Sequence, residues 1–155
     1  MIAIDPQVVC CVALGLAASA EDLWRRQISN WIPVAGIVSG LGWHVWQGGG
    51  WGLLSALGGM LGAFAMFLIF YLLGGMGGGD VKLMAAFGAL LGPSGLVPLG
   101  LGAAVVGGIW ALGAVAWVEV KRRWLRRAAR VEDASIPYAP AITLGAWLAL
   151  IPAGR

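Results

Sequence analysis

The chain has 155 residues, of which 60% are hydrophobic and only 11% are charged, whereas an ordinary soluble domain is about 45–50% apolar and about 25% charged. This composition excludes a soluble globular protein, a disordered chain, a collagen and a disulfide scaffold, and it indicates a helical membrane protein. Because one crossing of the bilayer needs roughly 20 apolar residues, we expect a single membrane-embedded domain over residues 1–155.

The net charge of +3 does not indicate a nucleic-acid-binding face. The basic residues lie between or beyond the apolar runs, so we interpret them as orientation signals, and we expect all of them except Arg155 on the cytoplasmic side. They are Arg25, Arg26, Lys82, the basic cluster Lys121, Arg122, Arg123, Arg126, Arg127 and Arg130, and the terminal Arg155. We therefore expect the lipid bilayer, and no nucleic acid, as a partner.

The first apolar run, 8–20, ends in small residues that superficially resemble a signal-peptide cleavage site. No basic residue precedes this run, however, and Arg25 and Arg26 follow it. We therefore expect a helix that stays attached and crosses from the outside to the cytoplasm. The next two runs, 31–46 and 51–73, are separated by a glycine-rich turn without charge. They predict a helical hairpin that returns to the cytoplasm.

The apolar stretch 83–118 is too long for one span and just long enough for two short ones, and the Pro93–Gly95 segment separates them. A re-entrant helix at 83–92 would place the basic cluster outside, against the positive-inside rule, so we expect 83–92 to span. The last run, 136–151, returns the chain outwards. The predicted fold class is an all-α membrane protein with about six transmembrane helices and both termini on the outer side.

Other conspicuous residues are expected to have packing or anchoring roles. Cys10 and Cys11 are adjacent in an apolar run and are interpreted as packing residues. The lone His44 is expected near the outer surface, and the sequence offers no metal-ligand spacing. Tryptophans beside the helix ends are expected to anchor the chain at the membrane surfaces: Trp24, Trp31, Trp46, Trp51 and Trp124. Glycines within the helices are expected to form packing faces: Gly58, Gly59, Gly62, Gly100, Gly102, Gly107 and Gly108.

Two acidic residues, Asp22 and Asp80, lie at the predicted cytoplasmic helix ends within recognisable local patterns. An ionisable group at membrane depth is costly and therefore indicates function. The Gly77–Gly79 run before Asp80 leaves a backbone that another helix and a peptide can approach. Two close carboxylates share a proton, so one can activate water while the other donates to a carbonyl, without a metal. The alternative is a glycine loop whose acid pairs with Lys82 or Arg26.

Three segments resemble the motifs of the type IV prepilin peptidases. Residues 22–30 resemble D-x3-R-x-I-P-N, with Ser29 in place of proline. Residues 77–83 match G-x-G-D-x-K-L completely, and residues 136–140 resemble I-P-[FY]-G-P, with Ala139 in place of glycine. The motifs occur in order and at matching topological places. The resemblance covers nearly the whole chain and is closest to the short peptidases of tight-adherence (Flp-type) pili.

This resemblance implies a six-helix membrane aspartic peptidase of the bacterial inner membrane. Such enzymes remove the short basic leader from prepilins or pseudopilins at the cytoplasmic face, before the apolar segment used in pilus assembly, and need no cofactor. It also implies that Asp22 and Asp80 are the catalytic pair. The supporting or substrate-binding residues would be Gly77, Gly79, Lys82, Arg26 and Asn30. The tetracysteine segment of the longer members does not occur here, so we expect peptidase activity and do not expect N-methylation.

Two alternatives stay open at this point. A membrane protease of the presenilin or signal-peptide-peptidase type would pair a Y-D helix with a G-x-G-D helix and carry a P-A-L motif. Here Glu21 precedes Asp22, and Pro140-Ala141 is followed by Ile142. A non-enzymatic scaffold or proton-coupled transporter, whose paired acids relay protons, would explain the two aspartates but not the surrounding motifs.

Overall fold

The computed structural model describes residues 5–25, 27–74, 76–125 and 139–150. Within these ranges every regular element is a helix, which confirms the all-α class. The elements are α1 (Pro6–Arg25), α2 (Trp31–Leu72), α3 (Gly78–Leu91), the 3-10 helix η1 (Pro93–Gly95), α4 (Leu96–Leu125) and α5 (Ala139–Leu150). Both α1 and α2 are long and apolar enough to cross a membrane. The six spans and the outer position of the termini stay predictions.

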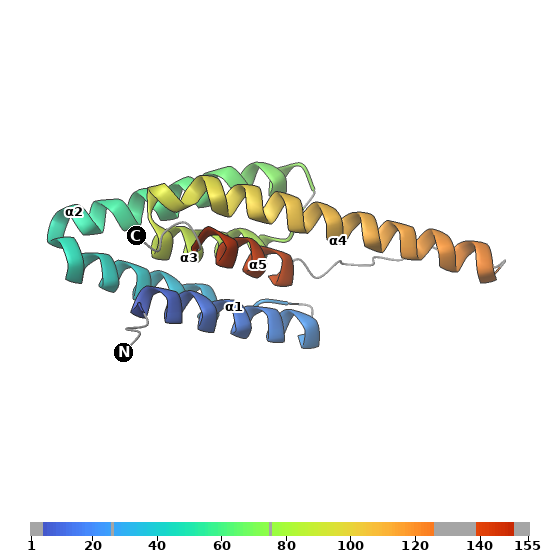
Figure 1. Cartoon of the computed structure of the whole chain (residues 1–155), viewed down its shortest axis with the longest axis horizontal. Helices are drawn as coiled ribbons and strands as arrows, with labels where there is room; N and C mark the ends of the chain where they lie inside the picture. Colours follow the sequence, from blue (N-terminus) through green and yellow to red (C-terminus); the bar gives the residue numbers. More distant parts are fainter. Residues whose placement is uncertain (1–4, 26, 75, 126–138, 151–155) are drawn as a thin grey trace.

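The 42 residues of α2 form a hairpin with two arms. Gly49 interrupts the helix with φ of 54° and ψ of −129°, a backbone conformation that glycine adopts without steric cost. The chain reverses there, as Figure 1 shows at the left of the molecule. The turn falls in the glycine run that the sequence predicts between the second and third apolar runs, so the helical hairpin is present.

The short helix α3 lies at the centre of the bundle. All its residues from Leu83 to Leu91 are buried, as expected of a helix that is apolar on every side. Glycines on both arms of α2 allow close approach: a Cβ on Gly40 would lie 2.6 Å from the carbonyl carbon of Ala89, and one on Gly59 would lie 2.7 Å from the Cα of Gly92. Backbones that meet in this way are typical of helix packing in membranes.

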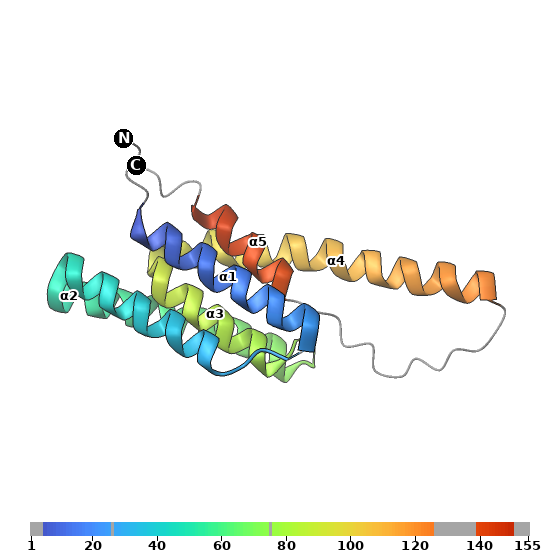
Figure 2. The same ribbon diagram turned by 90° about the horizontal axis from the view of Figure 1, so that it is seen from below.

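The helix α5 joins α1 to α4. Ser19 donates a hydrogen bond to Thr143 Oγ1 at 3.1 Å, and Thr143 donates in turn to the Gly15 carbonyl at 3.2 Å. On the other side, a Cβ on Gly102 of α4 would lie 2.6 Å from the Cα of Gly145. Figure 2 shows α5 beside both α1 and α4.

Most glycines expected on packing faces do pack. A Cβ on Gly62 would meet Leu96 at 2.6 Å, and one on Gly100 would meet the sulfur of Met66 at 3.0 Å. At Gly107 and Gly108, in contrast, an added Cβ would have no atom within 4 Å from the part of the chain that the structure describes. The packing prediction is therefore not met for these two positions within that part.

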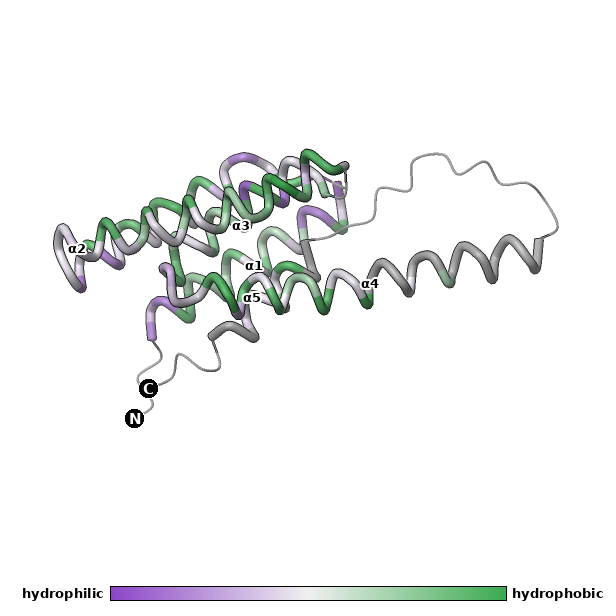
Figure 3. The backbone as a smooth tube through the Cα atoms, turned by 90° about the horizontal axis from the view of Figure 1, so that it is seen from above, coloured by the Kyte–Doolittle hydropathy of each residue, from purple (hydrophilic) through white to green (hydrophobic). Residues whose placement is uncertain are grey.

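The helices run antiparallel, so the bundle has two distinct ends (Figures 1 and 2). At one end α1 finishes and α3 begins, and at the other lie the Gly49 turn and the end of α3. Trp24 and Trp31 are 91% and 79% exposed at the first end, and Trp46 and Trp51 flank the Gly49 turn. Figure 3 shows hydrophobic residues along the arms of α2 and hydrophilic ones where α1 finishes. This pattern fits anchoring at two membrane surfaces.

The helix α4 is longer than predicted. The sequence suggests an end near Val118, but the helix continues about two turns further, to Leu125. Residues 114–125 contain no glycine or proline, so nothing in the backbone interrupts the helix at the start of the basic cluster. The remainder of that cluster, 126–130, and most of the third motif lie outside the described residues.

Candidate active site

Asp22 lies near the end of α1 and faces the bundle interior. Cys11, Gly15, Ala18 and Asp22 are all buried, and their spacing of three to four residues places them on one face of the helix. The Asp22 side chain is only 7% exposed. The same packing that holds α1 against α5 therefore carries this carboxyl group inwards.

Asp80 lies in the first turn of α3 and is 8% exposed. Gly77 precedes the helix in an extended conformation, and its N–H donates a hydrogen bond to Asp80 Oδ2 at 3.3 Å. A carboxylate at this position accepts a backbone hydrogen bond and interacts favourably with the positive end of the helix dipole. A Cβ on Gly77 would lie 3.1 Å from the same oxygen, so a larger residue would crowd it.

The two aspartates line one pocket of about 320 Å³. The pocket also contains Gly77, Gly78 and Gly79 from the start of α3, and Gln27 and Ile28 from the loop after α1. Segments that are about 50 residues apart in the chain thus meet at one hollow. The structure brings together both predicted catalytic residues and the two predicted supporting glycines.

Asp80 lies ahead of the apolar stretch 83–92, outside the segments that we treat as membrane-spanning. Burial raises the pKa of its carboxyl group above the ordinary value, the negative charge of Asp22 raises the pKa further, and the hydrogen bond from Gly77 lowers it. Two neighbouring carboxyl groups, one of which has a raised pKa, can together retain a proton towards neutral pH. The pocket is therefore equipped for general acid and base chemistry.

The loop 27–30 closes one side of the pocket and joins the first motif to the second. Ile28 packs on Gly79, where an added Cβ would lie 3.3 Å from the Ile28 Cβ. Lys82 donates a hydrogen bond from Nζ to Asn30 Oδ1 at 2.8 Å. Two predicted supporting residues thus contact each other directly. Arg26, the remaining one, lies outside the described residues.

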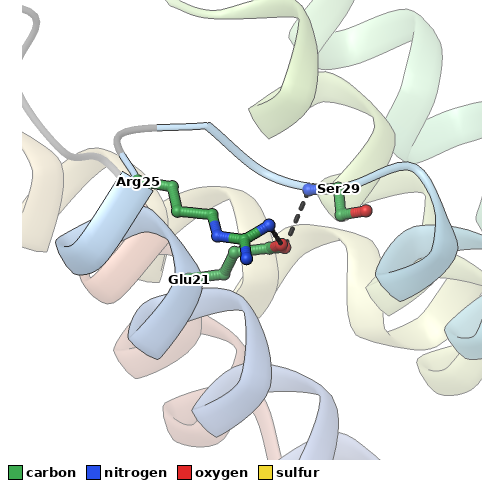
Figure 4. A network of polar contacts seen from close by, with 3 residues as sticks. All are labelled: Glu21, Arg25 and Ser29. Atoms are coloured by element: carbon green, nitrogen blue, oxygen red, sulfur yellow. Dashed lines mark hydrogen bonds and ion pairs between the residues drawn. The ribbon is translucent and has the colours of Figure 1, made fainter.

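Sequence reasoning assigned Glu21 no specific contact, yet this residue anchors the loop. The backbone N–H of Ser29 donates to Glu21 Oε2 at 2.8 Å, and Arg25 Nη1 lies 3.9 Å from Glu21 Oε1 (Figure 4). Ser29 stands where the motif has proline, and proline has no N–H to donate. Ser29 in place of proline was therefore the signal in the sequence for this contact. The substitution leaves a backbone N–H that can donate to Glu21, to which the sequence had assigned no partner.

The structure thus defines a class: an all-helical protein with two helices of membrane-spanning length and a pair of buried acids in one pocket. Residues 9–112 match the type IV leader peptidase family, a range that includes both aspartates and the first two motifs. The chain belongs to this family, which confirms the resemblance seen in the sequence and makes the protein a peptidase of the leader-peptide class. No curated protein and no solved structure matches the chain.

Proposed function

We propose that this chain is a multi-pass aspartic endopeptidase of the bacterial inner membrane. It removes the short basic leader from Flp-like prepilins or pseudopilins at the cytoplasmic face. The observation that carries the proposal is the pocket in which Asp22 and Asp80 are both buried, in a chain of the leader peptidase family. Family membership supports the substrate class, and the pair of acids supports the aspartic mechanism.

In the proposed reaction Asp80 holds the shared proton and Asp22 acts as the base. Asp22 takes a proton from a water molecule as the water oxygen attacks the scissile carbonyl carbon, and Asp80 gives its proton to the carbonyl oxygen. The C–N bond then breaks as the proton on Asp22 passes to the leaving amine and a hydroxyl of the intermediate returns a proton to Asp80. The raised pKa of Asp80 supports this assignment.

The surroundings of the pocket suit a basic peptide. The three glycines at its wall have no side chains, so a substrate backbone can come close to Asp80. Acidic groups attract the positive charges of a leader. The exposed Arg25 and Lys82 flank this end of the bundle, and the positive-inside rule assigns such an end to the cytoplasm. The substrate would then be cut where its leader emerges from the membrane.

The test is co-expression with a Flp-type prepilin in a host that lacks its own prepilin peptidase. Leader removal is followed by gel shift and amino-terminal sequencing. We expect cleavage by the wild type and none by Asp22→Asn or Asp80→Asn at equal protein levels. Asp5→Asn is the matched control, because Asp5 is exposed and lies before α1; this variant should cleave normally. Persistent cleavage by either dyad variant would refute the mechanism.

A further inference from the structure

A second hollow lies between α1 and the first arm of α2, with a volume of about 370 Å³. We call it the α1/α2 groove. Its floor consists of the buried residues Leu14, Gly36 and Leu90, and its rim includes the exposed residues Ala13, Ala17 and Ala35. The groove is therefore apolar and open at the outer surface of the bundle, with small side chains along both helices and Trp31 at the start of α2.

We propose that the α1/α2 groove binds the apolar helix of the substrate immediately after the scissile bond. This inference rests on the proposed function and extends it from the bond that is cut to the segment that positions it. It assigns a binding role to residues that lie outside all three motifs.

The dimensions and the rim of the groove fit a helix. On α1 the groove extends from Cys10 to Ala17, about 10 Å along the axis or two helical turns. Alanines on both sides would let the backbone of an incoming helix approach closely, which is the main source of helix association inside a membrane. A flexible lipid chain has no comparable need for small residues at the rim. We therefore assign the groove to a peptide helix.

The groove and the aspartate pocket are lined by neighbouring parts of the chain. Ala17 precedes Asp22 by five residues on α1, about 7 Å along the axis. In the segment that follows, Ile28 lines the pocket and Ile32 lines the groove. About three extended residues, at roughly 3.3 Å each, bridge this distance. In this proposal a substrate that is cut at the aspartates reaches the near end of the groove within a few residues, where the prepilin sequence is apolar.

The first test narrows the groove. Ala17→Phe and Ala35→Phe place large side chains at the rim, and Ala65→Phe places the same side chain at an exposed position on the second arm of α2. Two substrates are compared: the prepilin that the wild type cleaves, and a synthetic peptide that ends a few residues after the scissile bond. For each enzyme, kcat/KM for the prepilin is divided by kcat/KM for the peptide. We expect this ratio to fall about tenfold in the groove variants, because they bind the helix of the prepilin less tightly. The Ala65→Phe ratio should equal that of the wild type.

The second test detects contact through Cys10, which is half-buried in the groove wall. A single cysteine is moved through the first ten or so positions of the prepilin's apolar segment and linked to Cys10 of the Asp80→Asn enzyme with a short bismaleimide. A helix in the groove should give links that recur every three to four positions. Cys10→Ala should abolish them.

The outcomes separate the groove from the peptidase mechanism. If the wild type cleaves no prepilin, the proposed function fails. If it cleaves and the groove variants retain the wild-type ratio of kcat/KM values, the groove proposal fails while the function stands. An equal loss on both substrates, or links to a maleimide-bearing lipid in place of the prepilin, also overturns the groove proposal.

Discussion

Opposing interactions act on the pKa of the Asp80 carboxyl group. The first turn of α3 and the N–H of Gly77 favour the carboxylate, whereas burial and the charge of Asp22 favour the protonated acid, and these two dominate the pKa. A group whose pKa is raised by folding stabilises the fold at low pH and loses that contribution as the pH rises through the raised value. The Asp80 carboxyl group therefore reduces the stability of the folded protein at neutral and higher pH.

A thermal unfolding measurement checks whether Asp80 lowers the stability of the protein at neutral and higher pH. Asp80→Asn removes the charge and retains the size of the side chain, so it should raise the midpoint of thermal unfolding by about 2–4 °C at about pH 8. At about pH 4, where the wild-type acid is protonated in the folded protein, the difference should vanish. A variant that is less stable than the wild type at about pH 8 would contradict the raised pKa.

The hydrogen bond between Asn30 and Lys82 gives a second prediction at the scale of residues. Because this bond holds the loop 27–30 on α3, Asn30→Ala and Lys82→Met should each lower kcat by about three- to tenfold. The double variant should be no worse than either single one, since both remove the same contact. Lys82→Arg, which can still donate, should retain most of the activity. Additive losses in the double variant would mean that the two residues act separately.

Most residues that line the aspartate pocket were predictable because their motifs are short segments. Asp22 and Asp80, with Gly77 and Gly79, could be identified from local sequence alone. The contacts of the loop could not be identified in this way, because the 52 residues that separate Asn30 from Lys82 are brought together only by the packing of α3 against the two arms of α2. Ser29 in place of proline indicates that a backbone donor is available, but its contact with Glu21 depends on where α1 ends and how the loop turns.

At the scale of elements, α3 depends on glycines that let its neighbours come close. Gly59→Ala should destabilise the protein by about 1–3 kcal/mol, because the new Cβ would overlap the backbone around Gly92. Gly42 is the matched control: it lies in the first arm of α2 and has no described atom within 4 Å of an added Cβ. Gly42→Ala should be neutral or stabilising. Equal effects of the two substitutions on the unfolding midpoint in detergent would argue against close packing at Gly59.

The end of α3 is completed by other helices. The carbonyl oxygen of Leu90 accepts a hydrogen bond from Gln7 Nε2, and His44 Nε2 lies 3.1 Å from the same oxygen. Terminal carbonyls of a helix have no partner within the helix, and an apolar environment makes that costly. His44 therefore has a structural contact at the end of α3 opposite Asp80, far from the pocket, as the sequence led us to expect.

At the scale of the whole molecule, the order of the helices follows from the apolar runs and the glycine breaks between them, and the sequence predicts it well. The central position of α3 is different. Its apolar residues on every face are equally typical of a helix that contacts lipid and of one enclosed by protein. Only the glycines of the neighbouring helices, such as Gly40 and Gly59, distinguish the two cases, and their partners are distant in the chain.

The proposed topology predicts opposite accessibility of the two ends of the bundle. In a background without Cys10 and Cys11, Gln27→Cys should react with a membrane-impermeant maleimide only when the cytoplasmic face is open. Gly48→Cys, near the turn of α2, should react from the outside in intact cells or spheroplasts. Both positions are exposed, so reagent access does not depend on unfolding. Labelling of both positions from the same side would refute the hairpin as a pair of spans.

The length of α3 determines how far Asp80 lies from the opposite end of this helix. Its 14 residues extend about 21 Å, well short of the roughly 30 Å hydrocarbon thickness of a bilayer, and Gly92 lies beside His44 and Ser55 rather than at the tip of the α2 hairpin. Because the residues of α3 from Leu83 to Leu91 are enclosed by the other helices, this length determines distances inside the protein. In the proposed reaction the depth of the cut would follow the position of Asp80 at the start of α3, and one added helical turn would displace Asp80 by about 5 Å.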